Sequence, residues 1–318
     1  MAKASTTKRP PVRRRPGGPA KKAAVAPQRA GVGGWIGASR PRTLPLAIAP
    51  VALGTGAVWG QRLDGTYWLA FLALAVALLL QIGVNFANDY SDGVRGTDRF
   101  RVGPARLTAS GAAKPRTVLI AAIVCFALAA VAGLVIVVVT QQWWLLAVGA
   151  AAIAAAWFYT GGKRPYGYAG FGEIAVFLFF GVAATAGTSF VVAGTVTAES
   201  WFCALAIGCI ASAVLVVNNL RDIEQDAVAG KRTLSVRIGA RGSRILFGAL
   251  MTVPFLVVVY LAFFYPLAWL VLLVLLLAVP AVVITATART ARELILALSL
   301  TGITALVYGL GLAAALSF

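Results

Sequence analysis

The sequence predicts an all-α membrane protein with nine transmembrane helices. Hydrophobic residues make up 60% of the 318 residues and charged residues only 12%, a composition too apolar for a soluble globular domain. Several apolar runs reach the roughly 20 residues that a helix needs to cross a hydrocarbon core of about 30 Å. Lipid is therefore the expected solvent for most of the chain.

Nine apolar segments can be drawn along the chain, and each is expected to form one transmembrane helix. Their approximate bounds are 43–60, 66–88, 117–139, 142–160, 170–194, 200–220, 244–264, 266–287 and 293–317. Long polar loops at 89–116, 161–169 and 221–243 fall on one side of the membrane, and short links fall on the other. An odd number of spans places the two termini on opposite sides.

The basic residues set the orientation. On this threading 27 of the 28 Lys and Arg residues lie on the long-loop side, and Arg62 is the exception. The positive-inside rule makes that side cytoplasmic, with the amino terminus inside. Residues 1–34 are expected to form a disordered basic cytoplasmic tail, and residues 35–318 the transmembrane domain. The net charge of +18 thus reports topology and attraction to lipid headgroups and does not indicate nucleic-acid binding.

Six of the ten acidic residues fall in two tight groups. In the first group, Asn85, Asn88, Asp89 and Asp92 stand at i, i+3, i+4 and i+7, so they share one face of a helix that continues out of the second span. Asp98 follows after a stretch that contains two glycines. This first polar stripe begins inside the membrane and ends at its cytoplasmic surface.

The second group repeats the pattern at the end of the sixth span. Asn218, Asp222 and Asp226 stand at i, i+4 and i+8, again on one helical face. Carboxylates at this depth are costly unless they face a polar cavity or one another. The chain has no histidine, and Mg²⁺ takes one or two carboxylates together with waters and phosphate oxygens. We expect the two stripes to form a metal–diphosphate clamp, because the alternative of simple helix capping leaves two matching patterns unexplained.

Basic residues near the stripes are candidates for neutralising a diphosphate. They are Arg95, Arg101, Arg106, Lys163, Arg164, Arg221, Lys231 and Arg232. Lys163 and Arg164 occur in a short turn between Tyr159 and Tyr166, and Arg40 just precedes the first span. For most of the other candidates, topology or binding to lipid headgroups is the favoured explanation.

The chain from Trp35 to the carboxyl terminus resembles the UbiA superfamily of intramembrane prenyltransferases. The segments that carry the resemblance are Asn88-Asp-Tyr-Ser-Asp-Gly-Val-Arg-Gly-Thr-Asp98, Asn218-Asn-Leu-Arg-Asp-Ile-Glu-Gln-Asp226, Gly230-Lys-Arg-Thr-Leu234 and Tyr159 through Tyr168. They are similar to the branch that prenylates 1,4-dihydroxy-2-naphthoate in menaquinone biosynthesis. The resemblance implies nine helices around a lipid-open cavity and makes residues 35–318 the prenyltransferase domain.

The resemblance also implies the members of the site. Mg²⁺ would bridge the donor diphosphate to Asp89, Asp92, Asp222 and Asp226, and Asp98 would be a less regular ligand because its spacing is longer than that common in the superfamily. The residues expected to bind substrate are Asn85, Asn88, Asn218, Lys163, Arg164, Arg221, Arg40 and Tyr159. Glu173, at the start of the fifth span, is expected to be structural.

The implied activity is transfer of a polyprenyl group from polyprenyl diphosphate to 1,4-dihydroxy-2-naphthoate, with decarboxylation, giving demethylmenaquinone. The implied location is the bacterial plasma membrane, with a cytoplasmic active site and no obligatory protein partner. Two alternatives remain open. One is another aromatic prenyltransferase of the superfamily, and the other is a cation transporter, whose acidic path would have to continue through the bilayer.

Overall fold

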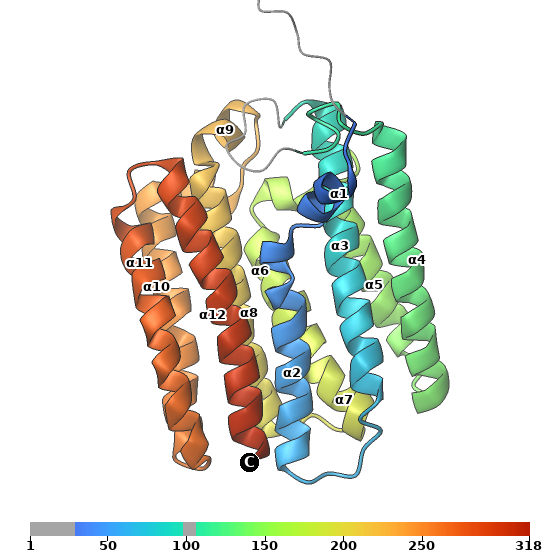
Figure 1. Ribbon diagram of the computed structural model, residues 1–318, viewed down its shortest axis with the longest axis vertical. Coiled ribbons are helices and arrows are strands. Elements are labelled where there is room, and N and C mark those ends of the chain that lie inside the picture. The colour runs from blue at the N-terminus through green and yellow to red at the C-terminus, as the bar shows by residue number, and fades with distance from the viewer. Residues whose placement is uncertain (1–28, 98–105) are drawn as a thin grey trace, which may run out of the picture.

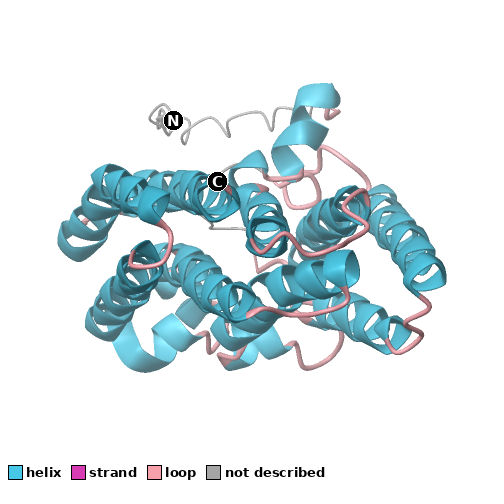
Figure 2. Ribbon diagram, turned by 90° about the horizontal axis from the view of Figure 1, so that it is seen from below, coloured by secondary structure: helices cyan, strands magenta, loops and turns pink. Residues whose placement is uncertain are grey.

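The computed structural model describes residues 29–97 and 106–318, which fold into a bundle of long helices (Figure 1). Every regular element of these residues is helical. Seen along the bundle axis, the helices pack side by side and are joined by loops at both ends (Figure 2). The expected all-α class is confirmed for the described part of the chain.

The amino-terminal half supplies the wall that carries the first stripe. Its elements are α1 (Val32–Ala38), η1 (Pro41–Thr43), α2 (Pro45–Gly60), α3 (Leu69–Arg95), α4 (Pro115–Thr140) and α5 (Leu145–Phe158). A short helix, η2 (Tyr166–Ala169), leads into a span made of α6 (Gly172–Val176), a π-helical stretch η3 (Phe177–Ala186) and α7 (Gly187–Ala193). The α3 helix packs along α4, and both contact α5.

The carboxyl-terminal half supplies the second stripe. Its elements are α8 (Ala198–Arg221), α9 (Ile223–Val228), α10 (Leu234–Ala262), η4 (Pro266–Val274), α11 (Leu275–Thr287) and α12 (Ala291–Ser317). The α8 helix is the most buried of the candidate spans and packs against α10, α12 and η3. It therefore forms the centre of the bundle.

The chain is a multi-pass membrane protein. Within the described residues, seven helices are long and apolar enough to cross a membrane, and the bent pair Val32–Thr43 and Pro45–Gly60 makes an eighth if it is one span. The ninth expected span corresponds to α5, whose 14 residues extend only about 21 Å at 1.5 Å per residue. The number nine and the cytoplasmic amino terminus thus stay predictions.

Most of the expected amino-terminal tail, residues 1–28, lies outside the described residues. Helix α1 begins at Val32, before the expected end of the tail at residue 34. Its Trp35 ring meets Phe86 of α3 edge-on, with ring centroids 5.6 Å apart. This aromatic contact gives the segment before the first span an ordered position against the helix that carries the first stripe.

Helix α3 continues past the expected apolar segment to Arg95, and Gly96 ends it in the left-handed conformation at φ 73°. All members of the first stripe except Asp98 are therefore on one helix, as expected, and Asp98 lies outside the described residues. The C-terminal end of α3 and helix α9 lie at the same end of the bundle, uppermost in Figure 1.

The second stripe is not one uninterrupted helix, contrary to expectation. Asp222 has φ −98° and ψ 10° and separates α8 from α9. The Asp226 N–H still donates to the Asp222 carbonyl at 2.8 Å, so a helix-like turn bridges the break. The spacing of the stripe is therefore preserved although the helix is interrupted.

Helices α2 and α12 approach so closely that glycine is required. A Cβ atom on Gly309 would lie 2.5 Å from the Ala49 Cβ, and one on Gly56 would lie 2.6 Å from the Ala313 carbonyl oxygen. Small residues let membrane helices pack backbone to backbone, which is their main source of association where lipid weakens the hydrophobic effect.

We expect Gly309→Ala to lower the free energy of unfolding by about 1–3 kcal/mol because the added methyl group overpacks this contact. Gly311→Ala is the matched control on the same helix, since its Cβ would meet only Val271 Cγ2, at 3.9 Å. Thermal unfolding of both variants in detergent measures the difference. Equal melting temperatures would contradict the close α2–α12 contact.

Candidate functional site

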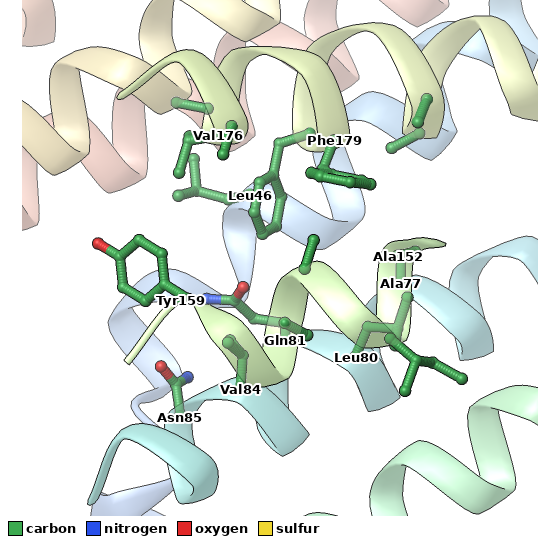
Figure 3. Close-up of a pocket in the computed structure, with 18 of the residues that line it drawn as sticks. Leu46, Ala77, Leu80, Gln81, Val84, Asn85, Ala152, Tyr159, Val176 and Phe179 are labelled. Carbon is green, nitrogen blue, oxygen red and sulfur yellow. The ribbon is translucent and has the colours of Figure 1, made fainter. Parts of the chain in front are cut away.

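A cavity of about 610 Å³ opens between the two halves of the bundle and receives both polar stripes. Its polar end includes Asn88, Asp92, Asn218, Asp222 and Asp226. The rest is mainly apolar, with side chains such as Leu46, Leu80, Val84 and Phe179 around one space, next to the Gln81 and Asn85 amides and the Tyr159 ring (Figure 3). The cavity thus joins a charged end to a long apolar chamber.

Asp92 of α3 connects the two halves of the site. Its carboxylate accepts a hydrogen bond from the Tyr168 hydroxyl and pairs with Arg106, whose Nη1 lies 3.1 Å from Oδ2. Lys231 Nζ lies 3.7 Å from the same oxygen. Burial, followed by the nearby Asp92 charge, raises the pKa of Tyr168 well above its usual range, so this hydroxyl remains a proton donor at neutral pH.

Asp226 of α9 and Asp92 of α3 lie on either side of the Lys231 ammonium group. Lys231 Nζ also lies 3.7 Å from Asp226 Oδ1, and it stands over the Tyr168 ring at 4.6 Å from the centroid. Both side chains are largely buried, with 3% of the Asp92 side chain and 13% of the Asp226 side chain exposed, and charges there are screened less than at a protein surface. The two stripes therefore turn toward each other at this point.

Asp222 is held by its neighbour Arg221. The guanidinium donates from Nε to Oδ1 at 2.7 Å and from Nη2 to Oδ2 at 2.6 Å, a bidentate arrangement of high geometric specificity. Nη2 also donates to Asn218 Oδ1 at 2.9 Å. Asp222 and Asn218 line the cavity, whereas Arg221 supports them from behind.

Asp89 has a different environment from the other acids. Its carboxylate accepts the backbone N–H of Leu107 at 2.8 Å and that of Thr108 at 2.9 Å, and it is not among the residues that line the cavity. Asp89 thus anchors the loop that carries Arg106, and its role as a metal ligand stays a prediction. Asp89 and Asp92 point to different neighbours although both are on the stripe side of α3.

The amides of the first stripe hold neighbouring segments together at the cavity wall. Asn88 Oδ1 accepts the Thr160 hydroxyl at 2.6 Å, and Asn85 Nδ2 donates to the Ser39 carbonyl at 2.9 Å. Both Asn side chains line the cavity. They connect α3 to the end of α5 and to the segment before α2.

The remaining substrate-binding predictions divide into two groups. Arg40 and Tyr159 line the cavity. Lys163 and Arg164 are exposed and do not line it.

Two polar features of the site were not predicted from the sequence. Tyr168 is within the turn that the sequence singled out, but its contact with Asp92 joins residues 76 positions apart, which no local spacing encodes. Thr233 lines the cavity with a buried hydroxyl that has no hydrogen-bond partner among the described residues. Glu173 accepts a hydrogen bond from Asn219 Nδ2 at 2.9 Å, and its structural role stays a prediction.

The donor chemistry of the site suits a hard divalent cation. Among the described residues no three or more His, Cys, Asp or Glu side chains form a ready-made metal cluster. Mg²⁺ does not require one, because it usually combines one or two carboxylates with waters and substrate phosphates. Asp92 and Asp226, which bracket a single cation position, match that requirement.

Known proteins give independent information about this chain. Residues 47–294 match the UbiA prenyltransferase family. The chain is 49% identical to a 1,4-dihydroxy-2-naphthoate octaprenyltransferase of Mycobacterium tuberculosis over 285 residues, which cover 89% of this chain and 97% of that protein.

Solved structures share the fold at low sequence identity. A UbiA homolog from Aeropyrum pernix, in its apo form, superposes with a TM-score of 0.65 at 16% identity, covering 85% of this chain and 97% of that one. A UbiA homolog from Archaeoglobus fulgidus bound to GPP and Mg²⁺ gives 0.63 at 17% identity, covering 90% and 100%. With the family match extending over most of the transmembrane domain, the chain belongs to the UbiA prenyltransferase family.

Proposed function

We propose that this protein transfers a polyprenyl group from polyprenyl diphosphate to 1,4-dihydroxy-2-naphthoate, with loss of carbon dioxide and diphosphate, to form the hydroquinone of demethylmenaquinone. The observation that carries the proposal is the meeting of two carboxylate-bearing helix ends at the charged end of an apolar cavity. The 49% identity to an enzyme named for this acceptor supports the choice of substrate.

The diphosphate would bind at the charged end. Asp92, Asp222 and Asp226 would hold Mg²⁺ together with waters and diphosphate oxygens, a role supported by the GPP and Mg²⁺ in the Archaeoglobus fulgidus homolog. The metal would neutralise charge that develops on the leaving diphosphate. Arg106 and Lys231, which border the same carboxylates, would donate further hydrogen bonds to it.

The prenyl chain and the acceptor would occupy the remaining cavity. Its volume of about 610 Å³ lies within the range of about 300–1,000 Å³ that is usual for small-molecule sites. Arg40 lines the cavity near Tyr159, where its planar guanidinium would pair with the acceptor carboxylate. The exposed Lys163 and Arg164 are less suited to this role.

The apolar walls would determine the fate of the reactive intermediate. The cations at the diphosphate favour breakage of the C–O bond, which gives an allylic carbocation. Walls of Leu, Val and Phe exclude the water that would capture this carbocation, and the Tyr159 ring offers a π-face toward it. The electron-rich naphthoate ring then forms the new C–C bond, and loss of carbon dioxide from the same carbon restores aromaticity.

The orientation in the membrane follows from the charge pattern. The proposed site lies at the end of the bundle opposite the loop that contains Arg62, the single basic residue predicted outside. We propose that this end faces the cytoplasm of a bacterial cell, with the protein in the plasma membrane.

A direct assay tests the proposed reaction. Purified protein receives Mg²⁺, a polyprenyl diphosphate and one member of a panel of aromatic acids, and mass spectrometry identifies the product while released carbon dioxide is measured. We expect product only with 1,4-dihydroxy-2-naphthoate, one carbon dioxide per transfer, and none of either in excess EDTA. Full turnover in EDTA, or preference for hydroxybenzoate, would contradict the proposal.

Asp92→Asn and Asp226→Asn are each expected to reduce transfer at least about 100-fold, because each substitution removes a charge that helps to hold the metal against the diphosphate. Asn keeps the shape of Asp and limits damage to packing. Asp64→Asn is the matched control, because Asp64 is exposed and belongs to the loop between α2 and α3, which lies at the opposite end of the bundle. Near-normal turnover in either site variant would argue against the clamp.

Asp89→Asn is expected to reduce transfer about tenfold, because the amide group can replace only one of the two acceptor oxygens that anchor the Arg106 loop. The metal concentration that gives half-maximal activity should stay unchanged, and limited proteolysis at residues 106–113 should become faster. A large increase in the metal requirement, with normal proteolysis, would instead identify Asp89 as a ligand.

A further inference from the structure

The carboxylates proposed to hold the metal already have cationic partners within the protein. Arg106 pairs with Asp92, Arg221 with Asp222, and Lys231 lies between Asp92 and Asp226. Among the described residues, each of these three acids thus has at least one basic side chain within 4 Å in a largely buried site. Adding a divalent cation alone would leave this site with excess positive charge, which a low-dielectric environment penalises.

We propose that Lys231 acts as an internal counter-ion that occupies the cation position between Asp92 and Asp226, so that a divalent metal binds tightly only when a prenyl diphosphate enters with it. This inference rests on the proposed function and adds a coupling between its two ligands. A diphosphate brings several negative charges, which compensate both the metal and the displaced ammonium group.

The distances identify Lys231 as the exchangeable cation of the three. Its Nζ lies 3.7 Å from each carboxylate, beyond the roughly 2.7–2.9 Å of a close charge-assisted hydrogen bond. Arg221 instead grips Asp222 at 2.6 and 2.7 Å. Lys231 is therefore attracted by both acids without being fixed to either, which is the position of a bridging ion.

The surroundings allow the side chain to move while the backbone stays in place. The Lys231 N–H donates to the Asp226 carbonyl at 2.8 Å, which fixes the main chain at the end of α9. The ammonium group stands 4.6 Å from the Tyr168 ring centroid, and a cation over such a ring is stabilised. A short swing of the flexible lysine stem would keep this contact and release both carboxylates to the metal.

Direct metal binding tests the coupling without relying on turnover. Mn²⁺ serves as the probe because the electron paramagnetic resonance signal of the free aqua ion disappears on binding. Purified protein in detergent is titrated with and without a non-cleavable prenyl thiolodiphosphate. We expect the wild-type protein to bind Mn²⁺ at least about tenfold more tightly with the thiolodiphosphate, as charge compensation at this range predicts.

Replacing Lys231 with a neutral residue should make Mn²⁺ binding less dependent on the thiolodiphosphate. Lys231→Gln is expected to bind Mn²⁺ alone about tenfold more tightly than the wild type, because a competing buried charge is lost. Lys231→Met is a second neutral variant whose apolar stem keeps the packing against Tyr168. Lys231→Arg keeps the charge and should retain the coupling. Lys114→Gln is the control for loss of a lysine, since Lys114 is exposed and does not line the cavity.

The outcomes separate this inference from the proposed function. If the wild type binds Mn²⁺ only with the thiolodiphosphate and both neutral variants behave identically to it, the role of Lys231 is wrong and the metal site stands. If the wild type binds no Mn²⁺ under either condition, the metal site of the proposed function fails and the inference fails with it. Thermal unfolding of each variant establishes that it is folded before titration.

Discussion

The balance of buried charge at the ends of α3 and α9 is the constraint on which the rest of the structure depends. Carboxylates at this depth are tolerated only with compensating partners, and Asp92 finds them in three different segments: Arg106, Tyr168 and Lys231. Each partner comes from a loop or a short helix and not from a long span. The long spans determine how deeply the acids are buried. The connecting segments supply the cations and hydrogen-bond donors that offset the cost of burying them.

The sequence was sufficient to predict the features that depend on local periodicity. Hydrophobic runs located the helices, and the i, i+3, i+4, i+7 spacing placed Asn85, Asn88 and Asp92 on the cavity side of α3. The family resemblance is confirmed by the match over residues 47–294. These properties are encoded within single segments, where helical geometry relates sequence spacing directly to direction in space.

Contacts between distant segments could not be predicted in the same way. Asp89 shares the stripe with Asp92, yet its oxygens accept two backbone N–H groups of the Leu107–Thr108 segment. Spacing gives the face of a helix, but the partner on that face depends on how a separate loop folds back. The same limit applies to Lys231, which the sequence offered only as one of eight basic candidates.

The π-helical stretch at Phe177–Ala186 is a part of the apolar chamber wall where inserted or deleted residues can change the lining. Several residues of this stretch line the cavity, Phe179 among them, and π-helical turns, which form i→i+5 hydrogen bonds, contain more residues than α-helical turns. Because such a turn holds an extra residue inside a continuous helix, deleting one residue there would let the helix return to α geometry while the helix beyond it keeps its direction. Insertions and deletions in η3 are thus a route by which evolution can reshape the hydrocarbon compartment without altering the ionic end of the protein.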